Sequence, residues 1–128
     1  MQKQLGCIPS PWRKDYQWLI EGSAAYIGWE TAIASGDLDR AWVDALLHNM
    51  HDDPSLGSLT YYERNIDGDA AYALGYQAVE QLVDRTGSVR SLNDFCRSVG
   101  SDTRWRTAFA QTFGIELNEF YAAFEGSR

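Results

Sequence analysis

The sequence predicts an all-α fold: a single domain of about six helices over residues 1–128, with its core at about residues 12–126. Apolar side chains recur at helical spacing through almost the whole chain. No segment of strand length alternates apolar and polar residues convincingly, and glycines stand where the periodic segments stop. The 128 residues are 45% apolar and 23% charged, which is ordinary for a globular domain with one core. We expect two longer N-terminal helices, one central helix and three short C-terminal helices.

Gly36 separates the two N-terminal helices. The first is predicted over about residues 14–35, because apolar side chains recur at i, i+7, i+11 and i+15, namely at Trp18, Ala25, Trp29 and Ile33. Asp37 is a candidate N-cap for the second helix, whose predicted inward side chains are Leu38, Trp42, Ala45 and Leu46. Residues 52–68 contain glycines and a proline, so they predict a long connection with one helical turn at about residues 59–63.

The central helix is predicted over residues 69–86. Asp69 can cap its start and Gly87 can end it, and its regularly spaced side chains are Tyr72, Tyr76, Val79 and Val83. Three short helices follow, separated by glycines, with Ser91 and Asp102 as candidate caps. Their apolar stripes are Leu92, Phe95, Cys96 and Val99; then Trp105, Ala108, Phe109 and Thr112; then Leu117, Phe120, Tyr121 and Phe124.

Charge and apolar content exclude several classes of partner. The net charge is -7, so the chain lacks the basic surface that a nucleic acid or an anionic membrane attracts. No apolar run approaches the ~20 residues that cross a bilayer, and residues 1–12 lack the hydrophobic region of a signal peptide. Cys7 and Cys96 match no metal or redox spacing. We therefore expect a cytoplasmic protein with free thiols, in which Cys96 packs as a small hydrophobic side chain.

Two segments carry a resemblance to a known family. Residues 18–26 read WLIEGSAAY, of the form WL-x-EG-x-A-x-Y, and residues 72–79 read YALGYQAV, of the form Y-x-x-G-x-x-x-V. In order and spacing they resemble the C-terminal helical lobe of gluzincin-like zinc metallopeptidases (peptidase MA-like), and the match covers about residues 12–126. The resemblance implies that Glu21 corresponds to the third zinc ligand. It also implies that Tyr72 or Tyr76 corresponds to the residue that polarises the scissile carbonyl. Read without the resemblance, Glu21 is a solvated residue near a helix start and the two tyrosines are core residues.

The chain departs from the family at the catalytic motif. Zinc hydrolysis there needs HExxH, which supplies two ligands and the general base, and this sequence has no such motif. Its histidines are His48 and His51, spaced i, i+3, which are weak candidates for metal ligands and otherwise solvated residues at a helix end. Glu21 is therefore interpreted as a vestigial ligand. We predict no cofactor, and zinc only if a separate chain bearing HExxH completes the site.

The missing helix also leaves one face of the first helix to be covered. The small-residue stripe Glu21, Ala25, Gly28 and Ala32 would face it. A matching stripe on the central helix offers a cover, through Ala71, Gly75, Ala78 and Leu82. Otherwise we expect self-association or a protein partner on the Glu21 face.

Three functions follow from these patterns. The favoured one is a non-catalytic helical binding or assembly domain derived from a peptidase lobe. One alternative is a peptidase half-site completed by another chain. The other is a small-ligand domain lined by aromatic side chains, with Trp18, Tyr26, Trp29, Tyr72 and Tyr76 as candidate binding residues.

Overall fold

The computed structural model describes residues 16–51, 56–64, 66, 69–100 and 104–127. This part of the chain is all-α, as predicted, and contains six α-helices and one short 3-10 helix. They are α1 (Gln17–Ser35), α2 (Arg40–His51), η2 (Leu59–Tyr62), α3 (Asp69–Thr86), α4 (Arg90–Gly100), α5 (Trp105–Phe113) and α6 (Leu117–Gly126). The predicted turn at residues 59–63 is confirmed as η2. The predicted start of the first helix at about residue 14 lies outside the described residues.

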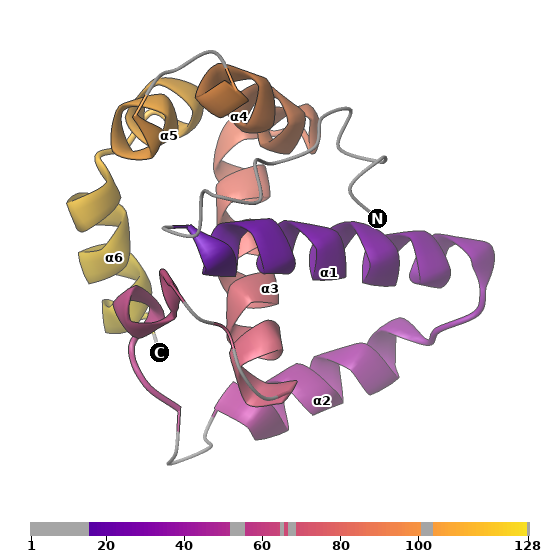
Figure 1. Cartoon of the computed structure of the whole chain (residues 1–128). Helices are drawn as coiled ribbons and strands as arrows, with labels where there is room; N and C mark the ends of the chain where they lie inside the picture. Colours follow the sequence, from indigo (N-terminus) through magenta and orange to yellow (C-terminus); the bar gives the residue numbers. More distant parts are fainter. Residues whose placement is uncertain (1–15, 52–55, 65, 67–68, 101–103, 128) are drawn as a thin grey trace.

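The crossing of α1 over α3 is the centre of the fold (Figure 1). The two helices meet at Gly22 and Gly75: a Cβ atom built on Gly22 would lie 2.5 Å from the carbonyl oxygen of Gly75. The predicted stripe on the central helix is buried over its whole length, at Ala71, Gly75, Ala78 and Leu82. Only residues without side chains bring two helix backbones this close. Direct packing of α1 on α3, one of the two covers that the sequence left open, is therefore what the structure shows. On α1 the close contact is made by Gly22, and of the predicted stripe only Ala25 is buried, while Glu21, Gly28 and Ala32 are partly buried.

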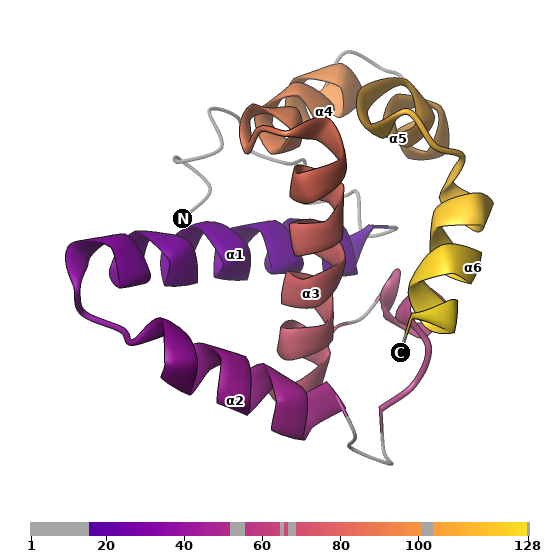
Figure 2. The same cartoon turned by 180° about the vertical axis from the view of Figure 1, so that it is seen from behind.

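The remaining helices occupy two sides of this crossing. In Figures 1 and 2, α2 returns along one side of α1, while α4, α5 and α6 curve around the opposite end of α3. Contacts join α3 to α1, α2, α4, α5 and η2, so α3 is the central helix in space as well as in sequence. Its apolar side chains are accordingly buried on several faces, and its exposed polar side chains include Gln81, Asp84 and Arg85.

The predicted inward face of α2 is wrong at Trp42 and Ala45, which are exposed, whereas Leu38 just before the helix packs against the core as predicted. Val43 and Leu47 are the buried side chains, packed against Ala73 and Tyr76 of α3, whereas Trp42 is 56% exposed. Successive residues of a helix point about 100° apart, so the face that holds Val43 against α3 turns Trp42 outward. Neither helix propensity nor the spacing of apolar residues shows which of two adjacent apolar faces of α2 is buried. The packing of α2 against α3 decides it.

Two predicted helix caps are also wrong. Asp37 ends α1 instead of beginning α2: its N–H donates to the Ala32 carbonyl (2.8 Å) beside Gly36, whose φ is 85°, as in a Schellman motif. Asp39 caps α2, since its Oδ1 accepts the N–H of Ala41 (3.2 Å).

At α4, Ser88 holds the cap position, because its Oγ accepts the N–H of Arg90 (3.1 Å). Ser91 lies inside the helix and is buried. Its Oγ donates to the Ser88 carbonyl (2.9 Å) and accepts from the Thr86 hydroxyl (2.9 Å). Asp102 and the side chain of Asp69 lie outside the described residues.

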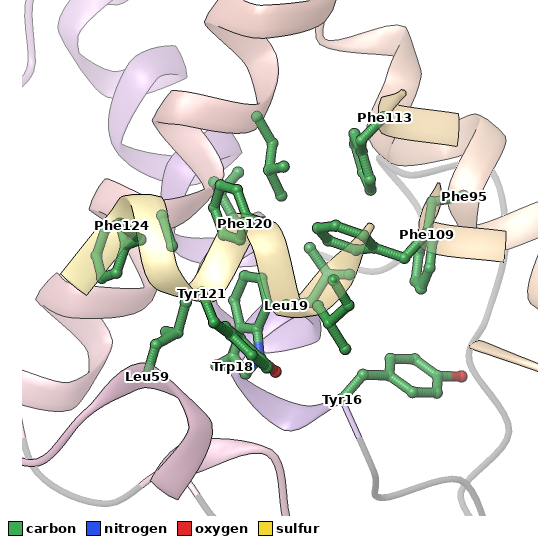
Figure 3. Close-up of a cluster of buried hydrophobic side chains, with 14 of the residues drawn as sticks. Tyr16, Trp18, Leu19, Leu59, Phe95, Phe109, Phe113, Phe120, Tyr121 and Phe124 are labelled. Atoms are coloured by element: carbon green, nitrogen blue, oxygen red, sulfur yellow. The ribbon is translucent and has the colours of Figure 1, made fainter. Parts of the chain in front are cut away.

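An aromatic core fills the space between α1, α5 and α6 (Figure 3). Trp18 is fully buried there and contacts the rings of Phe109, Phe120 and Tyr121. The Trp18 indole N–H donates to the Tyr121 hydroxyl (2.9 Å), which donates to Glu63 Oε2 (2.6 Å). These bonds tie the chain after η2 to α1 and α6.

The prediction of free thiols is wrong for Cys96, which is disulfide-bonded and partly buried on α4. Cys7 is the other cysteine of the sequence and lies outside the described residues. Pairing depends on the distance between two cysteines in space, which their separation along the chain does not show. Among the helices that the structure describes, none combines the length and the apolar composition that a bilayer crossing requires.

Candidate functional site

An open cleft of about 340 Å³ lies between α2 and α3. Its lining residues are Asp44, Leu47 and His48 of α2 and Gln77 and Glu80 of α3. We call it the α2–α3 cleft. Its size is at the lower end of the range of small-ligand sites, and its lining is unusually polar for one. The cleft therefore suits a charged or strongly hydrogen-bonding group rather than an apolar one.

Aromatic side chains of α1 and α3 form a cluster next to this cleft. Tyr26 and Trp29 of α1 pack on the ring of Tyr76, with ring centroids 5.3 and 5.1 Å apart. Leu47 belongs to the same apolar cluster and also lines the cleft. Tyr26 and Trp29 are partly exposed, while Tyr76 is fully buried. Three of the five predicted binding residues therefore come together beside the cleft.

The Tyr76 hydroxyl is the unusual atom of this cluster. It is buried and makes no close hydrogen bond, but the Arg40 guanidinium faces it and is a weak hydrogen-bond donor to it. Burial, followed by the charges of Glu30 and Glu80, raises the pKa of Tyr76, and Arg40 opposes this effect. The hydroxyl thus stays protonated near neutral pH. A buried polar group without a close hydrogen bond destabilises a fold by up to about 1–3 kcal/mol.

Acidic side chains of three helices surround the hydroxyl and the cleft. Glu30 of α1 is paired with Arg40 of α2, whose Nη2 lies 2.6 Å from Glu30 Oε2. Glu80 has a pKa raised by burial first, then by the charges of Asp84, Glu30 and Asp44, while Arg40 lowers it. Tyr26 has a raised pKa for the same kinds of reason: burial, then Glu30, Glu80 and Asp84. Negative charge therefore exceeds positive charge at this junction.

Replacing Glu80 with glutamine is expected to raise the melting temperature at pH 7. Because folding raises the pKa of Glu80, its carboxylate is less favourable in the folded chain than in the unfolded chain. The stability associated with the protonated form is fully present below the unfolded pKa and is lost as the pH rises through the folded one. Glutamine does not ionise, so the Glu80→Gln variant does not lose this stability as the pH rises.

The difference between the Glu80→Gln variant and the parent should therefore shrink as the pH falls below about 4, the ordinary range of a glutamate. Melting curves at pH 7 and at pH 3.5 measure it. A variant that is less stable than the parent at pH 7 would mean that Glu80 is held by a favourable partner.

The structure distributes the other predicted site residues over different surroundings. Trp18 lies in the aromatic core, where Tyr121 already bonds its indole, so a ligand at the cleft does not reach it. Tyr72 is 37% exposed on α3. Glu21 is partly buried on α1, and the neighbour that meets α3 is Gly22 rather than Glu21.

His48 lies on the cleft and is exposed, whereas the side chain of His51 lies outside the described residues. In the described part of the chain, no three His, Cys, Asp or Glu side chains come together as a metal site. Glu21 and His48 are thus not brought into one cluster of that kind.

Sequence reasoning missed the charged residues of the junction, although a signal was present. Polar side chains stand at four-residue spacing on each helix: Tyr26 and Glu30; Arg40, Asp44 and His48; Tyr76, Glu80 and Asp84. Residues four apart share a helix face, so each row was visible. Such rows are also typical of solvated faces, and only the packing of the helices shows that they meet.

Comparison of the chain with known proteins finds no matching family model, no matching curated protein and no matching solved structure.

Proposed function

We propose that this chain is a non-catalytic helical binding domain whose ligand site is the α2–α3 cleft. The observation that supports this best is the open polar cleft itself, whose Leu47 wall also belongs to the aromatic cluster of Tyr26, Trp29 and Tyr76. Behind that wall, the buried Tyr76 hydroxyl makes no close hydrogen bond and is faced by Arg40. A polar atom that weakens the free protein is accounted for if ligand binding improves its hydrogen bonding.

We also keep the proposed ancestry in a gluzincin-like lobe. It rests on the motifs at residues 18–26 and 72–79, and it makes Glu21 a vestigial ligand and Tyr76 a residue retained for contact with a bound molecule. The peptidase half-site has no further support among the described residues. Self-association, or a protein partner on the Glu21 face, stays a prediction.

The proposal includes the cellular compartment in which the protein works. Disulfides persist mainly in oxidising compartments and are uncommon in the reducing cytosol. The disulfide at Cys96 therefore favours an oxidising compartment over the cytoplasm that the cysteine pattern predicted.

Tyr76→Phe tests the binding proposal, because it is expected to act in opposite directions on stability and on binding. The free variant should gain about 1 kcal/mol in its free energy of unfolding, since it loses a buried hydroxyl that makes no close hydrogen bond. Thermal shift should then be measured with three probe sets: alkyl amines, alkyl carboxylates and neutral aromatic fragments. At least one set should raise the melting temperature of the parent, and it should raise that of Tyr76→Phe less.

The matched control is Tyr72→Phe, which changes an exposed tyrosine on the same helix. It should leave both stability and thermal shift at the parent values. A Tyr76→Phe variant that is less stable than the parent, or that responds to every probe as the parent does, contradicts the proposal.

A further inference from the structure

We infer that Cys96 of α4 is bonded to Cys7 of the same chain, and that this disulfide is a reducible cross-link between the N-terminal segment and α4. Three observations carry the inference: the bonded state of Cys96, the cysteine content of the sequence and the contacts of Tyr16. It does not depend on a ligand at the α2–α3 cleft.

The number of cysteines limits the possible partners of Cys96. Cys96 is disulfide-bonded, and the sequence contains two cysteines, Cys7 and Cys96. Within one chain, Cys7 is therefore the partner available to Cys96. The alternative is a bond to a second copy, in which Cys96 of one chain is joined to Cys96 or Cys7 of the other.

The position of Tyr16 favours a bond within one chain. The Tyr16 ring is buried, and its centroid lies 5.7 Å from that of Phe95, the residue that precedes Cys96 on α4 (Figure 3). Only nine steps along the chain separate Cys7 from Tyr16, and nine residues can span about 30 Å. Cys7 is therefore tethered within reach of Cys96. Such a tether gives a higher effective concentration than a second copy supplies in dilute solution.

The contacts at the start of α1 limit what the cross-link holds. Tyr16 packs against the ring of Trp105 as well as that of Phe95, and the N–H of Gln17 donates to the Glu63 carbonyl (2.7 Å). These contacts hold the start of α1 without the disulfide. Breaking the disulfide should therefore release the segment before Tyr16 from α4 and leave the helices formed.

The exposure of Cys96 makes the bond accessible to a thiol. Cys96 is only partly buried, and exposed disulfides are among the more easily reduced ones. A dithiol supplies two electrons and two protons: the bond between the two Sγ atoms breaks, Cys7 and Cys96 become thiols, and the dithiol is oxidised to a cyclic disulfide. The redox state of the surroundings then decides whether the N-terminal segment is attached to α4.

Peptide mapping of the full chain without reduction tests the pairing. After free thiols are blocked, trypsin should release residues 4–13 linked to residues 91–97, because these two peptides are bounded by Lys3, Arg13, Arg90 and Arg97. The unreduced protein should have the mass of one chain. Two copies of residues 91–97 linked together, two blocked peptides, or a covalent dimer would overturn the inference.

Treatment of the folded protein with dithiothreitol tests whether the cross-link is reducible. Both cysteines should become open to alkylation while circular dichroism keeps its helical signal. The melting temperature should fall by about 10 °C or more, since the bond closes a loop of about 90 residues.

Cys7→Ser is the matched variant for this treatment. It should melt at the temperature of the reduced parent and should not respond to dithiothreitol. The reducible cross-link is refuted if the thiols stay protected until the chain unfolds, if reduction leaves the melting temperature unchanged, or if Cys7→Ser melts like the oxidised parent.

Discussion

Replacing Gly22 with alanine is expected to lower the free energy of unfolding by about 3 kcal/mol, at the upper end of overpacking effects. The new Cβ would lie 2.5 Å from the carbonyl oxygen of Gly75 and 2.7 Å from its carbonyl carbon. These are backbone atoms, so no side-chain rotation relieves the contact and α1 must move away from α3. Alanine favours a helix over glycine by only about 1 kcal/mol, which offsets a minor part of the loss.

Urea unfolding followed by far-ultraviolet circular dichroism measures this effect. Gly126→Ala is the control, because its added Cβ would meet nothing within 4 Å at the end of α6. Gly75→Ala should be intermediate, since its Cβ would lie 3.1 Å from the Trp18 carbonyl oxygen. An unchanged or higher midpoint for Gly22→Ala would contradict the close crossing of α1 and α3.

Replacing Tyr121 with phenylalanine is expected to lower the free energy of unfolding by about 2 kcal/mol. Its hydroxyl accepts the Trp18 indole N–H at 2.9 Å and donates to Glu63 at 2.6 Å. Burial, followed by the bond to Glu63, raises the pKa of Tyr121, so the hydroxyl remains a donor near neutral pH. Without it, the indole N–H of the fully buried Trp18 loses its partner.

Glu63 loses less, because Arg106 Nη2 still lies 3.3 Å from its Oε2 and its side chain is 18% exposed. Tyr61→Phe serves as the control, since Tyr61 is 75% exposed on η2. If Tyr121→Phe and Tyr61→Phe unfold at the same urea concentration, the buried bond to Trp18 contributes nothing and this description of the core is wrong.

Tyr121 and Tyr76 form a useful pair. The Tyr121 hydroxyl makes two close hydrogen bonds, whereas the Tyr76 hydroxyl makes none and is only faced by Arg40. Removal of the first should therefore destabilise the domain and removal of the second should stabilise it. The sign of each effect follows from hydrogen-bond satisfaction rather than from burial, because both residues are buried.

Local chemistry made the helix ends predictable. Gly36, Gly87 and Gly114 all take left-handed φ values, of 85°, 77° and 71°, where other residues are strained. Caps were harder to predict, because Asp37 and Asp39 are both suitable residues and only the hydrogen bonds choose between them.

The buried face of a helix could be predicted from the sequence only where the helix carries a single apolar stripe. The stripe of Ala71 and Gly75 on α3 was found, but α2 offers two adjacent stripes, and contact with Tyr76 selects Val43 over Trp42. The proposed binding site depends on this choice, because the same rotation of α2 brings Asp44 to the cleft. Sequence periodicity carries no information on that rotation.

The proposed ligand site at the junction of α1, α2 and α3 is tested most directly by a ¹H–¹⁵N NMR titration of the full chain with the probe set that raises its melting temperature most. We expect saturable shifts of the Trp29 indole, the Gln77 side-chain amide and the backbone amides of Asp44 and Glu80, with the Trp18 indole unchanged. Shifts spread over acidic residues of the whole surface, or none at these four residues, would contradict the account.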